Sequence, residues 1–156
     1  MHRLLVLLVA VVLAGCAPLP PAPPPPLSGP VPDLVGTWRG TWAGEPLTLL
    51  IVTQTAESPY SGFSVADYQL FGMRRPGVSG VLTSTIRGEA VSSRAEGWLG
   101  GDATGRLLLL VQTDTPWGLQ YLTLARIGRD QLAGSGDSSF TWGPRGPAEL
   151  TRQPPR

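Results

Sequence analysis

The residues best suited to nucleophilic or metal chemistry are almost absent from this chain. Its 156 residues include one cysteine, Cys16, and one histidine, His2, both close to the N-terminus. Residues 33–156 contain no cysteine, histidine or lysine. This inventory excludes disulfides, thiolate or imidazole metal sites, and Ser-His or Cys-His nucleophile pairs from that region. We therefore expect no metal site and no cofactor there.

Carboxylates are the remaining route to catalysis, because a glycosidase needs only two suitably spaced acids. Most of the eleven acids fall in predicted turns, where a side-chain to backbone hydrogen bond accounts for them; examples are Asp102, Asp114, Asp130 and Asp137. No acid pair is placed by the sequence, so we predict that the protein is not an enzyme. Eleven arginines balance the eleven acids once Arg3 is set aside, which argues against nucleic-acid binding.

The first fifteen residues have the three parts of a secretory signal peptide. Arg3 supplies positive charge, residues 4–13 are almost continuously aliphatic, and Ala14 and Gly15 are small. The apolar run is shorter than the roughly 20 residues that a transmembrane helix needs, and prolines follow it instead of a basic flank. We therefore interpret residues 1–15 as a signal peptide and not as a permanent membrane span.

The stretch Leu13-Ala14-Gly15-Cys16 resembles the lipobox of bacterial lipoproteins. That resemblance implies that Cys16 receives a diacylglyceryl group and becomes the first residue after cleavage. Two or three acyl chains would then hold the protein on a membrane. Ala17 follows, where an aspartate would favour inner-membrane retention, so the resemblance favours the outer membrane of the cell envelope, facing the periplasm. The alternative is a free or buried thiol at Cys16.

A proline-rich spacer follows the cysteine, so residues 16–32 form one segment of the predicted organisation. Nine of the sixteen residues in 17–32 are proline, which fixes φ and favours an extended polyproline II strand. At about 3.1 Å per residue this spacer reaches up to about 50 Å from the bilayer. An SH3-type ligand is the alternative interpretation of its PxxP content.

Residues 33–156 are long enough for a single domain with one core and show no sustained helical period. Alternating apolar residues broken by turn residues predict about 8 to 10 short strands. The predicted strands are 34–42, 47–53, 63–71, 78–86, 89–98, 106–113, 120–127, 131–135, 138–142 and 148–152. Gly100-Gly101-Asp102 and Gly128-Arg129-Asp130 are predicted hairpin connections. We expect an all-β fold, an antiparallel up-and-down β-barrel whose closure removes exposed edges.

The motif Gly36-Thr37-Trp38 on the first predicted strand resembles the G-x-W opening of lipocalins and other calycins, and avidin-type barrels open similarly. In lipocalins this tryptophan closes one barrel end and packs against an arginine near the last strand. The resemblance therefore implies a structural pair of Trp38 and Arg152, with the guanidinium stacked on the indole. The chain departs from lipocalins in having no cysteine pair and no evident helix before the last strand.

Three residues are candidate ligand contacts. Trp117 lies in the predicted loop DTPWG, where a loop aromatic suggests contact with another molecule. Ala90 and Ser92 belong to a strand of unusually small side chains, beside which the barrel either holds a cavity or is filled from opposite strands. Trp38 and Trp142 are expected to fill the barrel or cover its ends. The run 106–111, RLLLLV, does not alternate, which predicts burial on both faces or an outer contact surface.

Two functions follow from these patterns. The first is a membrane-anchored envelope lipoprotein whose β-barrel binds a small hydrophobic ligand. The alternative is a structural or assembly lipoprotein with a filled barrel, which contacts another envelope component, for example a protein. The two differ in whether the interior is hollow, which the sequence leaves open.

Overall fold

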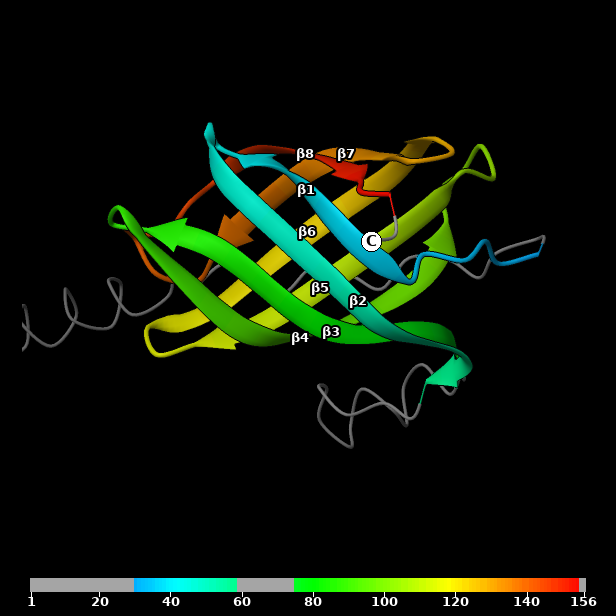
Figure 1. Cartoon of the computed structure of the whole chain (residues 1–156), viewed down its shortest axis with the longest axis horizontal. Helices are drawn as coiled ribbons and strands as arrows, with labels where there is room; N and C mark the ends of the chain where they lie inside the picture. The colour runs from blue at the N-terminus through cyan, green and yellow to red at the C-terminus, as the bar shows by residue number, and fades with distance from the viewer. Residues whose placement is uncertain (1–29, 59–74, 155–156) are drawn as a thin grey trace, which may run out of the picture.

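The computed structural model describes residues 30–58 and 75–154, and these form one closed antiparallel barrel (Figure 1). Each strand pairs with its neighbours in sequence, and β1 closes the barrel against β8. The strands are β1 (Gly36–Trp42), β2 (Glu45–Ser58), β3 (Arg75–Ile86), β4 (Glu89–Gly101), β5 (Leu107–Thr115), β6 (Gly118–Gly128), β7 (Gln131–Ser138) and β8 (Gly146–Arg152). The all-β, up-and-down barrel predicted from the sequence is confirmed, with eight strands.

The strand prediction was wrong at 138–142, where the chain forms an irregular loop over residues 139–145. Alternation misled there because Arg145 and Gly143 bond to carbonyls within the loop and keep it out of the ladder. At the β4–β5 connection the strand runs on through Gly101, and the turn lies over residues 102–106. The predicted strand 63–71 lies outside the described residues. No helix long and apolar enough to span a membrane occurs among the described residues.

The core fills the barrel with side chains from alternate positions of the strands. It holds leucines from most strands together with Trp38 and Trp42, all nearly inaccessible to solvent. The RLLLLV run shows why its pattern does not alternate. Leu107, Leu109 and Val111 belong to the core cluster, whereas Leu110, on the opposite face of β5, is only 3% exposed and pairs with Trp98 of β4. Burial on both faces, one of the two predicted alternatives, is what the structure shows.

Candidate functional site

Buried side chains from opposite walls of the barrel meet in its interior. The Ser84 hydroxyl on β3 donates a 3.0 Å hydrogen bond to Oε1 of Gln120 on β6, and both residues are buried. Two other strands separate β3 from β6 on that side of the barrel, so this bond crosses the interior. A Cβ added at Gly136 would lie 2.5 Å from both Trp42 and Leu122, which shows how tightly this layer is packed.

Two buried donors in the same region, Trp42 Nε1 and Gln120 Nε2, have no hydrogen-bond partner among the described residues. Both side chains are 1% exposed. Their donors fit a buried water molecule better than an apolar guest, because orphaned polar groups disfavour apolar contact.

One end of the barrel, where residues 30–35 lead into β1, is closed by Leu34 and Trp38. We call it the Trp38 end. Both side chains are fully buried, and the Trp38 indole N–H donates a 2.8 Å hydrogen bond to the Leu34 carbonyl. The structure brings Arg152 over the same indole, with Cζ 5.7 Å from the ring centroid. Gly36 has φ of 135°, a value that side chains rarely adopt, which accounts for the glycine of the G-x-W motif.

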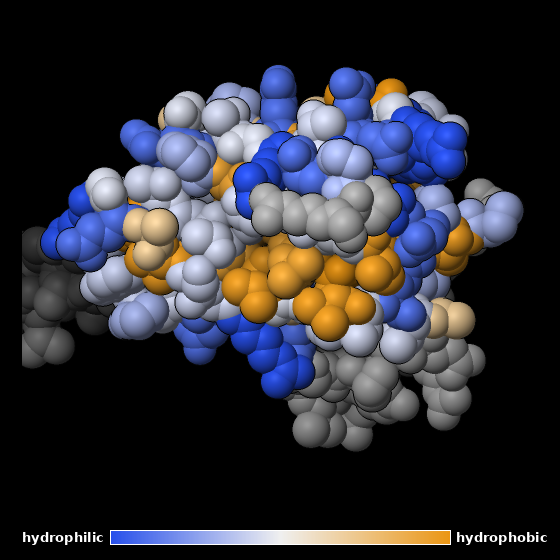
Figure 2. All heavy atoms as spheres, viewed as in Figure 1, coloured by the Kyte–Doolittle hydropathy of each residue, from blue (hydrophilic) through white to orange (hydrophobic). Residues whose placement is uncertain are grey.

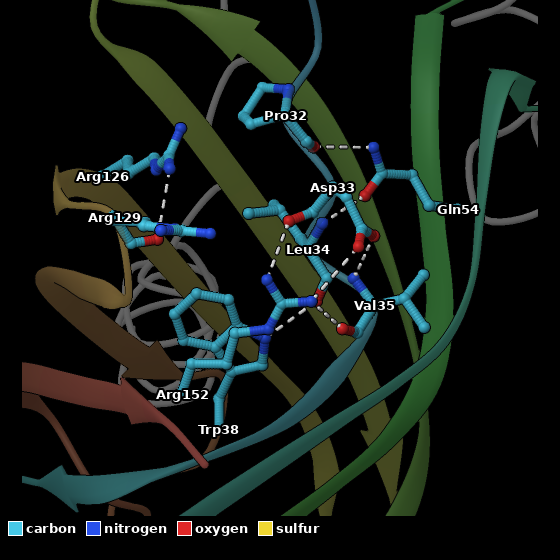
Figure 3. Close-up of polar contacts among 9 residues, drawn as sticks. All are labelled: Pro32, Asp33, Leu34, Val35, Trp38, Gln54, Arg126, Arg129 and Arg152. Atoms are coloured by element: carbon cyan, nitrogen blue, oxygen red, sulfur yellow. Dashed lines mark hydrogen bonds and ion pairs between the residues drawn. The ribbon is translucent and has the colours of Figure 1, made fainter. Parts of the chain in front are cut away.

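Arg152 and Gln54 clamp the chain just before β1 (Figure 3). The Arg152 guanidinium donates to the Asp33 carboxylate at 3.3 Å and also to the carbonyls of Asp33 and Val35. Gln54 accepts from the Leu34 amide and donates to the Pro32 carbonyl, each at 2.8 Å. The Val35 amide, which donates to Asp33, and then Arg152 hold the pKa of the Asp33 carboxyl below its ordinary value. The leading segment is therefore fixed on the barrel.

An open groove of about 890 Å³ lies beside this clamp. Its lining combines three arginines, one acid and several apolar or backbone groups: Val35, Gly36, Thr37, Arg39, Arg129, Asp130, Arg152, Gln153 and Pro154. Arg39 and Arg129 are both exposed. None of these lining residues belongs to the buried core, so the groove is a surface site and not a route into the barrel.

At the opposite end, which we call the Trp142 end, aromatic side chains are displayed. Trp117 occupies the two-residue β5–β6 turn and is 42% exposed, and Trp142 in loop 139–145 is 38% exposed. Their rings pack edge to face with centroids 5.5 Å apart. The ring centroids of Phe140 and Trp142 lie 4.7 Å apart. The Arg87 guanidinium lies over the Trp142 ring, with Cζ 3.9 Å from its centroid.

The loop that carries Trp142 is held by Arg145. This guanidinium bonds to the Asp137 carboxylate at 2.7 Å and to the carbonyls of Ser138, Phe140 and Thr141. Arg87, in the β3–β4 turn, has φ of 53°. A tight turn therefore holds the backbone of the residue whose guanidinium covers the Trp142 ring. Loops from three hairpins thus converge on one aromatic cluster: Arg87, Trp117, Phe140 and Trp142.

The ligand contacts predicted on β4 do not face the interior. Ala90 and Ser92 are exposed, whereas the alternate residue Ala95 belongs to the buried core. Their small size therefore adds no space inside the barrel, and their role in ligand binding stays a prediction. Trp117 is displayed at a loop, as its sequence context predicted. Cys16 lies outside the described residues.

The sequence did not point to Arg87, Phe140 or Arg145. Arg87-Gly88 was a usable signal, since a residue followed by glycine between two strands favours a tight hairpin turn. The bonds of Arg145 join residues that no short-range pattern links. Among residues 30–58 and 75–154, no group of three potential metal ligands occurs. No protein-family model matches the chain, and neither curated proteins nor solved structures give a significant match.

Proposed function

We propose that this protein is a non-enzymatic lipoprotein of the bacterial envelope, anchored through Cys16, whose filled barrel presents the Trp142 end to another envelope protein. The observation that carries this proposal is the pair of half-exposed tryptophans, Trp117 and Trp142. Their rings pack against each other, and they lie on an ordered turn and an ordered loop. The lipobox resemblance of residues 13–16 supports the anchor, with the outer membrane as its expected location.

An exposed aromatic pair suits recognition for two physical reasons. Tryptophan and arginine dominate the energetic centres of protein interfaces, because they bury large areas and carry a polar group. The rings at the Trp142 end are already ordered by Arg87, Phe140 and the Arg145 bonds, so binding costs less conformational entropy than it would with free side chains. A rigid, partly apolar tip is therefore ready for contact.

The other function predicted from the sequence, binding of a small apolar ligand, requires an internal cavity in its simplest form. The bond between Ser84 and Gln120 and the packing around Gly136 argue against one in the described part of the barrel. A small ligand that used Trp117 would meet it on the outside of the molecule.

A photo-crosslinking experiment in the native bacterium tests the proposal. A photoreactive phenylalanine replaces Trp117, and in a matched control it replaces Thr123, which is exposed on the wall of β6. We expect one defined protein adduct from position 117 that weakens when Trp142→Ala is added, and none from position 123. Equal adducts from both positions, or none from 117 in acylated protein, would overturn the proposed contact. Intact mass of the purified chain tests the anchor separately.

A further inference from the structure

The two ends of the barrel differ in charge as well as in aromatic content. At the Trp38 end, arginines outnumber acids among the described side chains, which are Asp33, Arg39, Asp102, Arg106, Arg126, Arg129, Asp130 and Arg152. At the Trp142 end the balance is reversed among Glu45, Arg87, Glu89, Asp114, Asp137, Arg145 and Glu149. Arg94 and Glu96, between the ends, pair at 2.9 Å. The charges of the described side chains therefore form an electrostatic dipole along the barrel axis.

Several positive groups at the Trp38 end are not neutralised by a neighbouring carboxylate. Arg106 and Arg152 pair with Asp102 and Asp33. Arg126 instead donates to the carbonyls of Gly128 and Arg129. The guanidinium groups of Arg39 and Arg129 make no ion pair among the described residues and line the groove. These two arginines are available to an external anion.

Exposed apolar side chains lie at the same end and on the adjoining wall of the barrel. Ile127, in the irregularity that ends β6 next to Arg129, is 58% exposed. Val35 lines the groove, and Val52 and Leu50 continue an apolar patch along β2. Figure 2 shows hydrophobic atoms gathered in the middle of the barrel wall that faces the viewer, where β1, β2 and β3 run in Figure 1, with hydrophilic residues around them. Such a patch beside arginines suits a lipid bilayer, whose acyl chains are apolar and whose headgroups are anionic.

We propose that the Trp38 end, through Arg39, Arg129, Ile127 and the patch of Val35, Leu50 and Val52, rests on the anionic headgroups of the membrane that holds the protein. This inference depends on the acylated Cys16 of the proposed function. The described chain reaches the barrel at this end, and residues 17–29 would span at most about 40 Å as an extended chain. The anchor therefore keeps these arginines at high effective concentration near the bilayer.

The charge dipole gives this contact a direction. Each arginine near an anionic leaflet contributes about 1 kcal/mol of attraction, whereas the acidic Trp142 end is repelled. Membrane contact by the Trp38 end would therefore point Trp117 and Trp142 away from the bilayer. The exposed aromatic pair would then be presented to partners and kept out of the lipid.

The test uses the acylated chain in vesicles of neutral phosphatidylcholine, with or without about one third anionic phosphatidylglycerol, a content chosen to give the surface a strong negative potential. A fluorophore is attached at Gln131→Cys, an exposed position of the Trp38 end, or at Thr141→Cys, an exposed position of the Trp142 end. Nitroxide-headgroup lipid quenches whichever label lies near the surface. We expect strong quenching at 131 only with anionic lipid, and weak quenching at 141 throughout.

Removing one charge should shift this equilibrium by a predictable amount. Arg129→Gln should lower the equilibrium constant for the docked state about fivefold. High salt should also lower this constant. Arg94→Gln, which removes an exposed charge from the barrel wall, is the matched control and should change little. Equal quenching at 131 and 141, or no effect of anionic lipid, would overturn the inference.

The same materials separate this inference from the anchor. If intact mass shows that Cys16 carries no acyl chain, the unacylated protein with Cys16→Ser, in which position 131 holds the one thiol, is labelled and mixed with the same vesicles. Anionic-lipid-dependent quenching at 131 would then support the docking surface while refuting the anchor, and its absence would overturn both.

Discussion

The two ends of this barrel close in opposite ways. At the Trp38 end a tryptophan is fully buried, its N–H is bonded, and an arginine covers it from the outside. At the Trp142 end Trp117 and Trp142 lie on a turn and a loop, with over a third of each surface exposed, whereas Trp42, the last residue of β1, is buried in the core. The tryptophans on strands are thus buried, whereas the two on a turn and a loop are exposed at the surface. The difference lies in whether a strand or a loop carries the ring.

The strongest test of this difference compares two tryptophan substitutions. Trp38→Ala should lower the free energy of unfolding by about 3 to 5 kcal/mol, since it removes a large side chain from the sealed core. Trp142→Ala should cost about 1 to 2 kcal/mol, because it loses only a ring pair and a cation–π contact at the surface. Urea denaturation followed by circular dichroism measures both. Equal losses would mean that the Trp142 end is structural and not a display surface.

A second prediction concerns the packing between the ends. Gly136→Val should destabilise the barrel by about 1 to 3 kcal/mol, because its side chain collides with Trp42 and Leu122 in a filled interior. Ser135→Val, one residue away and exposed, is the control and should have little effect. A hollow barrel would instead accept valine at position 136, and the two variants would then unfold at the same urea concentration.

A smaller effect is expected from the support of the aromatic loop. Arg145→Ala should cost about 1 kcal/mol, because its hydrogen bonds are largely at the surface. Arg145→Lys should not rescue it, since an ammonium group lacks the planar fork that reaches several carbonyls. Time-resolved fluorescence anisotropy should show faster motion of the tryptophans at this end in both variants. Unchanged anisotropy would show that the loop keeps its order without Arg145.

The smallest expected effect is the response of the Trp38 end to low pH. Because the pKa of Asp33 is lowered by the fold, its contribution to stability is present above the unfolded value of about 3.9 and is lost as the pH falls through the folded value. The Val35 amide resonance should therefore shift below about pH 4. In Asp33→Asn that step should vanish. A Val35 transition at or above the ordinary aspartate pKa would contradict the clamp.

Much of the fold was predictable because it depends on local patterns. Alternation placed most strands, and the G-x-W motif with a late arginine placed Trp38 beside Arg152. Loop 139–145 was not predictable, since Arg145 orders it through bonds to backbone carbonyls that any sequence possesses. The outward direction of Ala90 and Ser92 also depends on strand register, and a change of one residue reverses which face is inside. Trp117 was recognisable because a turn leaves no room for it in the core.

Native mass spectrometry of the processed chain, purified from a bacterial envelope, tests the filled barrel most directly. Its mass should equal that of the chain plus the covalent acyl groups on Cys16, and organic extraction should release no apolar molecule in stoichiometric amount. A bound lipid-sized mass that is lost on denaturation and reduced by Gly136→Val would contradict the account, because it would place a ligand where the structure has Trp42, Leu122 and Gln120.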